Sequence, residues 1–369
     1  MKLRVERDAL ADAVAWTART LPKNAGPRSG IMLEAENDSI TLSSSDSDVS
    51  GLARVEAAVE APGSVLVSGR LLADIARALP NAPVTIDIDS KVKLTCRRST
   101  FTLPLLPTED YPPIPELPPF IGKVSGPQFA QAVAQTQIAA SRNDGGQVVF
   151  TGIRLEVAGE LLTMAATDRF RLAVRELPWS PEQVDAEASV IVPGRSLAEA
   201  ARSLGHADAI RLALGDDERL LGLSGGEQQF TTRLLDGEYP KFRSLLPTSF
   251  STHVRVDVAE LSEAIKRAAL VTERNHAVRL HITEGEIRLE AGAGSETESE
   301  EFVEARLDGE PISIAFNPQY LLDGLTALDK PTAEMRCNEP GKPVVFVGTE
   351  EPAGDPDDSY QYLLMPVRI

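Results

Sequence analysis

The segment Val190-Ile-Val-Pro-Gly-Arg195-Ser-Leu decides the fold, because similar segments recur before and after it. Val65-Leu-Val-Ser-Gly-Arg70-Leu-Leu precedes it, and Ile312-Ser-Ile-Ala-Phe-Asn317-Pro-Gln follows it. Each is a short β-branched run, typical of a strand, that continues into a helix pattern. These helix patterns end at Leu79, Leu204 and Leu328, which are 125 and 124 residues apart. Self-similarity at a fixed period predicts three copies of one structural unit.

A second helical pattern repeats with the first. An apolar residue is followed by alanine three positions later and by an aliphatic residue four positions later: Leu10-Ala13-Val14, Phe129-Ala132-Val133 and Leu261-Ala264-Ile265. This spacing places the three residues on one helix face. The alternating runs 84–89, 278–282 and 286–291 predict strands. Each unit is therefore expected to be an α+β domain of two helices plus antiparallel sheets.

Connectors containing proline separate the copies at 103–119 and 240–250. We predict three domains at residues 1–120, 121–247 and 248–369. Three copies along one chain make a quasi-symmetric array, which can close into a ring if chains join head to tail.

Composition excludes several classes of protein. The two cysteines, Cys96 and Cys337, lie far apart, and the four histidines show no metal-ligand spacing, so we expect no metal site and no disulfide framework. The first residues lack a signal sequence and no run is long enough to span a membrane, which predicts a cytoplasmic protein. No phosphate loop or catalytic motif is present, so we expect neither a cofactor nor an enzyme.

The net charge of -18 is unevenly distributed. Residues 248–369 carry 11 Lys/Arg against 23 Asp/Glu, a net of -12. An acidic total argues against general nucleic-acid affinity but leaves room for a local basic stripe. Arg70 and Arg77 are seven residues apart on one predicted helix, and so are Arg195 and Arg202 on the corresponding helix of the second copy. Such residues are either solvated surface charges or a DNA-facing stripe, and their recurrence favours the stripe.

The C-terminal residues Tyr362-Leu-Leu-Met365-Pro-Val-Arg-Ile369 are an apolar run that ends in a Met-Pro hook. A terminus of this composition is expected to be the last strand of a sheet, docked on the body. It is either a plain edge strand with a buried tip or the wall of a surface groove.

Three motifs make the chain similar to a known family. Residues 166–174 (Ala-Thr-Asp-Arg-Phe-Arg-Leu-Ala-Val), 236–240 (Asp-Gly-Glu-Tyr-Pro) and the 365–369 hook resemble the bacterial β sliding clamp of DNA polymerase III. The resemblance covers the whole chain. It implies a head-to-tail homodimer whose six domains form a ring around duplex DNA without reading its sequence. Such a ring tethers the replicative DNA polymerase, the clamp loader and other partners that carry clamp-binding motifs.

The resemblance also assigns residues to three surfaces. It implies DNA contacts at Lys23, Arg70, Arg77, Arg142, Gln147, Arg195, Arg202 and Arg274. It implies a peptide groove of Phe150, Thr167, Arg171, Leu172, Pro240, Leu245, Val345, Phe346, Met365, Pro366, Val367 and Arg368. It implies a dimer seam in which Arg98, Phe101 and Leu103 meet Ala269, Leu270, Glu298, Glu301 and Glu304. Arg169, Phe170 and Ser244 depart from the family pattern beside the groove.

Two readings from other classes compete with the clamp. One is an acidic three-domain scaffold that binds peptides but no nucleic acid, which the net charge favours and the repeated basic stripes oppose. The other is an enzyme with its site between domains, which no cluster of titratable residues supports.

Overall fold

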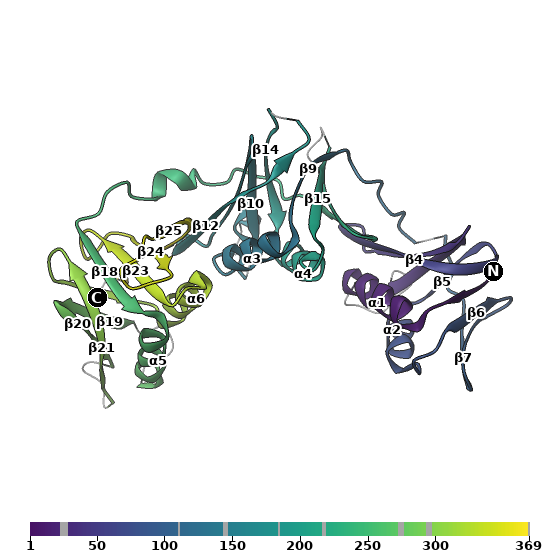
Figure 1. The fold of residues 1–369 in the computed structure, drawn as a ribbon, viewed down its shortest axis with the longest axis horizontal. Coiled ribbons are helices and arrows are strands. Elements are labelled where there is room, and N and C mark those ends of the chain that lie inside the picture. Colours follow the sequence, from purple (N-terminus) through teal and green to yellow (C-terminus); the bar gives the residue numbers. More distant parts are fainter. Residues whose placement is uncertain are drawn as a thin grey trace. The chain divides into compact units, whose positions relative to one another are not determined.

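The computed structural model describes residues 1–22, 29–109, 111–142, 147–183, 185–215, 219–271, 277–292 and 297–367. They form two compact units (Figure 1). Unit 1 contains Met1–Ala130, Trp179–Ala186 and Ser196–Leu234, and unit 2 contains Gln131–Pro178, Glu187–Arg195 and Leu235–Ile369. The middle of the chain therefore contributes to both units.

Unit 1 is built on a 13-stranded antiparallel sheet. Its main path runs β13-β9-β15-β16-β17-β4-β1-β6-β7-β8, and β2, β3 and β5 branch from it. The long strand β4 pairs with β1, β3 and β17 and so joins the parts of the sheet. The strands are β1 (Lys2–Val5), β2 (Gly30–Glu36), β3 (Ser39–Ser45), β4 (Val49–Ala61), β5 (Gly63–Ser68), β6 (Val84–Ile88), β7 (Val92–Cys96), β8 (Ser99–Leu103), β9 (Phe120–Ser125), β13 (Ser180–Pro181), β15 (Ala209–Leu214), β16 (Leu220–Gly225) and β17 (Gln228–Arg233).

Two helices pack together in the first part of unit 1. Helix α1 (Arg7–Thr17) continues into the short 3-10 helix η1 (Ala18–Thr20) and contacts both β4 and α2 (Gly69–Ala78). The α1 residues Leu10 and Val14 are fully buried, as the helical spacing predicts. Helix α2 follows β5 directly, which is the predicted strand-to-helix segment.

Unit 2 is built on a 12-stranded antiparallel sheet with the order β14-β10-β11-β12-β25-β24-β23-β18-β21-β20-β19-β22. The C-terminal strand β25 lies in its middle, between β12 and β24. The strands are β10 (Gly152–Ala158), β11 (Leu161–Thr167), β12 (Arg171–Pro178), β14 (Glu187–Pro193), β18 (Thr252–Asp257), β19 (Val278–Thr283), β20 (Gly285–Ala291), β21 (Ser299–Asp308), β22 (Ile312–Phe316), β23 (Thr332–Cys337), β24 (Val344–Thr349) and β25 (Asp357–Leu364).

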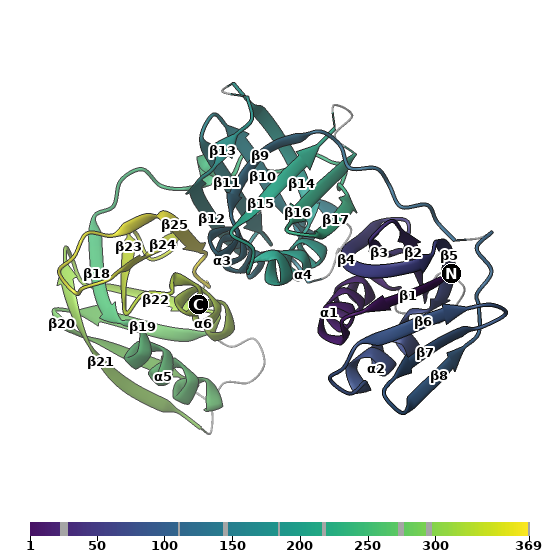
Figure 2. The ribbon, with the colours of Figure 1, turned by 45° about the vertical axis from the view of Figure 1, so that its right-hand side comes forward.

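A second helix pair packs on the unit 2 sheet (Figure 2). Helix α5 (Val258–Ala268) contacts β18, β20 and β21, and α6 (Pro318–Leu328) contacts β24 and β25. Each begins with an N-cap side chain: Asp257 accepts a hydrogen bond from the Glu260 N–H at 2.8 Å, and Asn317 accepts one from the Gln319 N–H at 2.9 Å. The remaining helices are α3 (Gly126–Gln137), α4 (Gly194–Leu204), η3 (Val148–Thr151), η4 (Phe242–Leu245) and η5 (Ala269–Val271).

The α+β prediction is confirmed, with repeated pairs of helices beside antiparallel sheets. The apolar residues that open the three helical patterns, Leu10, Phe129 and Leu261, are all fully buried. The predicted strand runs 84–89, 278–282 and 286–291 correspond to β6, β19 and β20. The cysteines Cys96 and Cys337 are free and buried.

Candidate peptide groove and nucleic-acid interface

The floor of the candidate groove is an apolar cluster in unit 2. Leu172 on β12 is fully buried there, and Leu363 on β25 is nearly so. The Tyr239 hydroxyl donates a hydrogen bond to the Ala165 carbonyl at 3.2 Å, and burial raises the pKa of Tyr239, so its hydroxyl stays a neutral donor. The other members of the cluster are Val174, Ile191, Phe242, Val345 and Val347.

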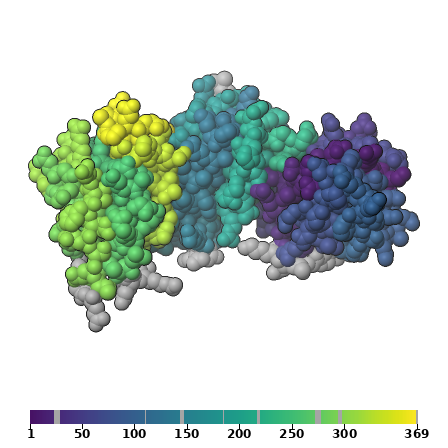
Figure 3. Space-filling model, turned by 60° about the horizontal axis from the view of Figure 1, so that its bottom comes forward, coloured from purple at the N-terminus to yellow at the C-terminus, as the bar shows by residue number. Residues whose placement is uncertain are grey.

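The hook after β25 is fixed by two backbone hydrogen bonds. The Met365 N–H donates to the Phe170 carbonyl at 2.9 Å, and the Val367 N–H donates to the Ala315 carbonyl at 2.8 Å. The side chain of Met365 is 37% exposed, and Val367 is similarly accessible. The C-terminal residues lie at the surface of unit 2, yellow in Figure 3. The hook is therefore a surface element that begins at the end of a buried strand.

A tight turn stands beside the hook and joins β11 to β12. One Asp168 carboxylate oxygen, Oδ1, accepts hydrogen bonds from the Phe170 and Arg171 N–H groups at 3.0 and 3.1 Å. The Thr167 hydroxyl donates to the Arg171 carbonyl at 2.7 Å and accepts from the Arg169 N–H at 3.1 Å. Arg169 has a φ of 78°, a left-handed conformation that is uncommon outside glycine. Local hydrogen bonds thus hold the turn in one shape.

Arg171 anchors this turn from below. Its guanidinium is only 4% exposed and binds Asp168 Oδ2 at 3.0 Å and Asp323 Oδ2, on α6, at 2.7 Å. It also lies over the Tyr320 ring, 4.2 Å from the ring centroid. A buried charge needs such partners, since an unpaired one is strongly destabilising. The residue assigned to the groove by resemblance is therefore a brace beneath it.

The remaining assigned groove residues divide into two sets. Buried residues form or support the floor: Phe150, Thr167, Leu172, Val345 and Phe346. More accessible residues line the edge: Pro240, Leu245, Met365, Pro366 and Val367. Arg368 lies outside the described residues. The structure adds an edge residue that the assignment did not contain, Phe170, whose side chain is 57% exposed. Its departure from the family pattern was the sequence signal for it.

The assigned DNA contacts that the structure describes are all exposed: Arg70, Arg77, Arg142, Gln147, Arg195 and Arg202. Lys23 and Arg274 lie outside the described residues. In α2, the Arg70 guanidinium donates to the Pro22 carbonyl at 3.1 Å, and Arg77 stands 4.0 Å from Asp74. The α4 residues Arg195 and Arg202 are two turns apart on one helix.

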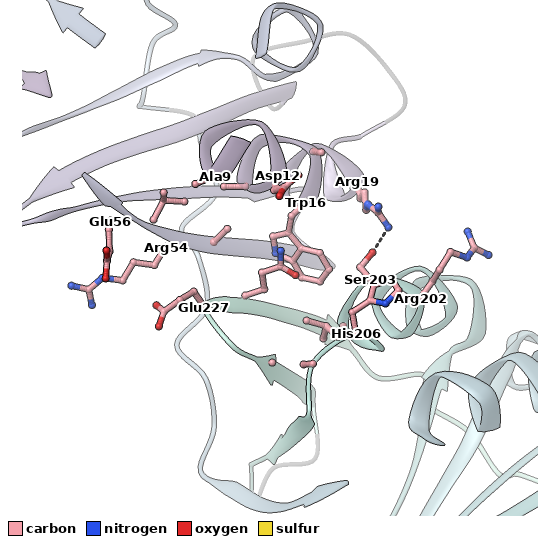
Figure 4. A pocket seen from close by; sticks show the side chains of 18 of the residues that line it. Ala9, Asp12, Trp16, Arg19, Arg54, Glu56, Arg202, Ser203, His206 and Glu227 are labelled. Atoms are coloured by element: carbon pink, nitrogen blue, oxygen red, sulfur yellow. Dashed lines mark hydrogen bonds between the residues drawn. The ribbon is translucent and has the colours of Figure 1, made fainter. Parts of the chain in front are cut away.

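A cavity of about 1000 Å³ in unit 1 brings further bases to Arg202 (Figure 4). Arg19, at the end of α1, donates a hydrogen bond to the Ser203 hydroxyl at the end of α4. His206 lines the same cavity, while Glu56 and Glu227 lie at its other end. Arg19 was missing from the assigned DNA contacts, although its position near a helix end could have suggested it.

The assigned seam residues include one very exposed apolar side chain, Leu270, at 84%. Phe302 on β21 is also exposed and was not assigned. The α5 residue Arg267 binds Glu301 through two hydrogen bonds of 3.0 and 2.7 Å. Leu103 is fully buried. The other assigned residues are exposed or intermediate: Arg98, Phe101, Ala269, Glu298 and Glu304.

No helix within the described ranges is long and apolar enough to cross a membrane. The same ranges contain no group of three His, Cys, Asp or Glu side chains placed to hold a metal ion.

Comparisons with known proteins cover the whole chain. Models of the DNA polymerase III beta subunit match its N-terminal domain to residues 1–115, its central domain to 123–241 and its C-terminal domain to 243–368. The beta sliding clamp of Streptomyces coelicolor is 47% identical over 375 residues, with 100% of both chains covered.

Solved structures agree with the sequence matches. The DNA polymerase III subunit beta from Pseudomonas aeruginosa has a TM-score of 0.91 at 27% identity, with 100% of both chains covered. A clamp from the same organism, bound to griselimycin, has a TM-score of 0.90 at 27% identity and the same coverage.

A repeated α+β fold of this kind defines a DNA sliding clamp, a non-enzymatic processivity factor that encircles DNA. The chain belongs to the DNA polymerase III beta subunit family, whose members are the bacterial β sliding clamps. The resemblance seen in the sequence is thereby confirmed, and the scaffold and enzyme readings are set aside.

Proposed function

We propose that two copies of this chain close head to tail into a six-domain ring in the bacterial cytoplasm, with domains at 1–120, 121–247 and 248–369. Phosphates would meet the exposed bases of α2 and α4, namely Arg70, Arg77, Arg195 and Arg202, together with Arg142 and Gln147. Attraction to phosphates does not depend on base sequence, so it holds DNA without stopping its movement. Topology then supplies processivity.

Partner proteins would bind the groove of unit 2 through short motifs rich in Gln, Leu and Phe. The observation that supports this assignment best is the hook: its backbone is fixed to Phe170 and Ala315, and its Met365 side chain remains accessible beside the buried Leu172. A rigid apolar pocket at a surface is the usual site of binding hot spots. The replicative polymerase and the clamp loader would compete for it.

The seam would bury Leu270 of one chain against Phe101 of the other. A side chain as exposed as Leu270 is costly to leave in water, and burying it contributes about 2 kcal/mol. The acidic residues Glu298, Glu301 and Glu304 face the basic Arg98 in this arrangement. Exposed ion pairs add little, so the apolar contact would dominate.

Retention on circular DNA tests the ring. The protein is loaded on a nicked circle, the circle is linearised in half of the sample, and bound protein is separated by gel filtration. A ring stays on the circle and slides off the free ends, and blocking those ends restores retention. Equal retention on both forms would point instead to a surface binder, and no binding to either would favour the acidic peptide-binding scaffold.

Removal of residues 365–369 tests the groove separately. The truncated protein should still form dimers and remain on circular DNA, because neither property uses the hook. Its affinity for a labelled nine-residue peptide with Gln, Leu and Phe anchors should fall at least tenfold, or about 1.4 kcal/mol. Unchanged affinity in a dimeric truncated protein would place the peptide site elsewhere.

A further inference from the structure

The turn beside the hook presents an aromatic side chain and a cation together. Phe170 is 57% exposed, and it lies next to Arg169, which is exposed as well. Its backbone carbonyl holds the hook through Met365. Surface phenylalanines are normal one at a time, but this one is continuous with the accessible apolar side chains of Leu245, Met365 and Val367 around the same cluster.

The backbone at this turn would favour glycine over arginine. A side chain at a φ of 78° costs roughly 1–2 kcal/mol, whereas glycine adopts this conformation freely. Stacking of the Arg169 guanidinium on the Phe150 ring, 5.5 Å from its centroid, recovers about 0.5–1 kcal/mol of this cost. The folded chain therefore gains little or nothing from an arginine here, which points to a role in binding.

Arg169 also has no carboxylate partner among the residues that the structure describes. No acidic oxygen of those residues lies within 4.0 Å of its guanidinium in an ion pair. The adjacent Asp168 is already engaged, since its Oδ1 accepts from two backbone N–H groups and its Oδ2 pairs with Arg171. The cation is therefore available to an anion from outside the chain.

The turn is rigid before any ligand arrives. Hydrogen bonds from Thr167 and Asp168 fix its backbone, and the buried Arg171 ties it to Asp323 on α6. Side chains on such a support lose little conformational freedom when a ligand binds, which raises affinity. A preorganised aromatic ring and a preorganised cation side by side match a peptide that carries an apolar residue next to a carboxylate.

We propose that Arg169 and Phe170 form a charged subsite at the edge of the groove, which selects partner peptides bearing an aspartate or glutamate beside their apolar anchors. This inference rests on the proposed peptide groove and specifies what the groove prefers. Phe170 packs on the peptide's apolar side chain, and Arg169 pairs with its carboxylate. The neighbouring Lys241, which is also exposed, supplies a matched control cation.

The test is fluorescence anisotropy with two matched series of nine-residue peptides that share Gln, Leu and Phe anchors. In one series a single Asp is moved through every non-anchor position, and in the other Asn takes its place. At one position the wild-type protein should bind the Asp peptide at least fivefold more tightly than the Asn peptide. This ratio should fall below twofold in 0.5 M NaCl, because salt screens an exposed ion pair.

Variants locate the effect. Arg169→Gln should bring the Asp/Asn ratio below twofold, and Arg169→Gly should do the same while easing the backbone strain, which guards against a folding defect. Lys241→Gln should leave the ratio unchanged. Phe170→Ser should weaken Asp and Asn peptides alike by about fivefold while preserving their ratio.

Three results would overturn the inference: no Asp preference at any position, a preference that survives in both Arg169 variants, or an equal loss in Lys241→Gln. If the wild type binds the peptides and hook removal abolishes binding, the groove stands even though the subsite fails. If the wild type binds none of the peptides, the groove assignment itself fails, and the subsite fails with it.

Discussion

Replacing Arg171 with methionine should destabilise unit 2 and weaken the groove at the same time. The substitution keeps an apolar stem but strands two carboxylates, Asp168 and Asp323, which now lie 3.0 and 2.7 Å from the guanidinium. Breaking a buried ion pair from one side costs about 3–5 kcal/mol. Asp168 and Asp323 are 11% and 19% exposed, so water can reach them in part, and the lower end applies.

Loss of the contact with the Tyr320 ring adds roughly 0.5–1 kcal/mol, for a total near 3–4 kcal/mol. Urea unfolding followed by circular dichroism measures this directly. With an m value of about 2–3 kcal/mol/M, the midpoint of the affected transition should fall by at least about 1 M. Peptide affinity should fall as well, because Arg171 braces the turn whose Phe170 carbonyl holds the hook.

Arg243→Met is the matched control, since this arginine pairs with Glu156 while 56% exposed and its loss should cost no more than about 1 kcal/mol. Adding Asp323→Asn to Arg171→Met removes one stranded charge and should recover part of the lost stability. An Arg171→Met protein within about 1 kcal/mol of wild type would refute the reasoning, because the buried pair would then contribute no more than a surface one.

Three further predictions concern the other surfaces. The pair Ala269→Asp and Leu270→Asp should give monomers in analytical ultracentrifugation, whereas Leu161→Asp, at the β10–β11 hairpin, should leave the dimer intact. Charge reversal of the exposed helix bases should lower the log–log salt slope of DNA binding by about 0.9 per lost phosphate contact, while reversal of the strand residue Arg211 should not; the reversed set is Arg70, Arg77, Arg195 and Arg202. Burial alone would raise the pKa of Glu334, but hydrogen bonds from Arg336 and Arg255 outweigh it and hold that pKa below its ordinary 4.5. The stability from this pairing is therefore complete above about pH 4.5 and lost as the pH falls through the lower folded value, so Glu334→Gln should reduce stability at pH 7 and flatten its acid dependence in thermal denaturation.

The fold could be predicted because its signals are local and repeated. The helix pattern beginning at Leu10 recurs at Phe129 and Leu261, and each of these residues is buried as the spacing requires. The site was less accessible to such reasoning. Arg171 is braced by Asp323, 152 positions away in the sequence, and no periodicity links them. The partition of the groove into a buried floor and an exposed edge likewise depends on tertiary packing, as Leu172 and Phe170 illustrate two residues apart.

The repeat also explains why one chain carries one groove. Unit 1 contains a turn of the same design as the groove turn: Asp46 Oδ1 accepts from the Asp48 and Val49 N–H groups, and Ser47 has a φ of 85°. The Arg233 N–H donates to the Asp48 carbonyl at 2.8 Å, as Met365 does to Phe170 in unit 2.

What differs is the chemistry beneath the two turns. At the positions corresponding to Ala165, Ala166 and Leu172, unit 1 has Ser43, Ser44 and Ser50. The Ser50 hydroxyl bonds to Thr231, and the Ser44 hydroxyl bonds to the Thr17 carbonyl, so this floor consists of hydroxyl groups, most of them already paired within the chain. An apolar peptide side chain gains little from such a floor, because covering it would bury polar groups without adding hydrogen bonds. Identical backbone architecture thus yields a peptide site only where alanine and leucine replace serine, and the number of grooves follows from side chains, not from the fold.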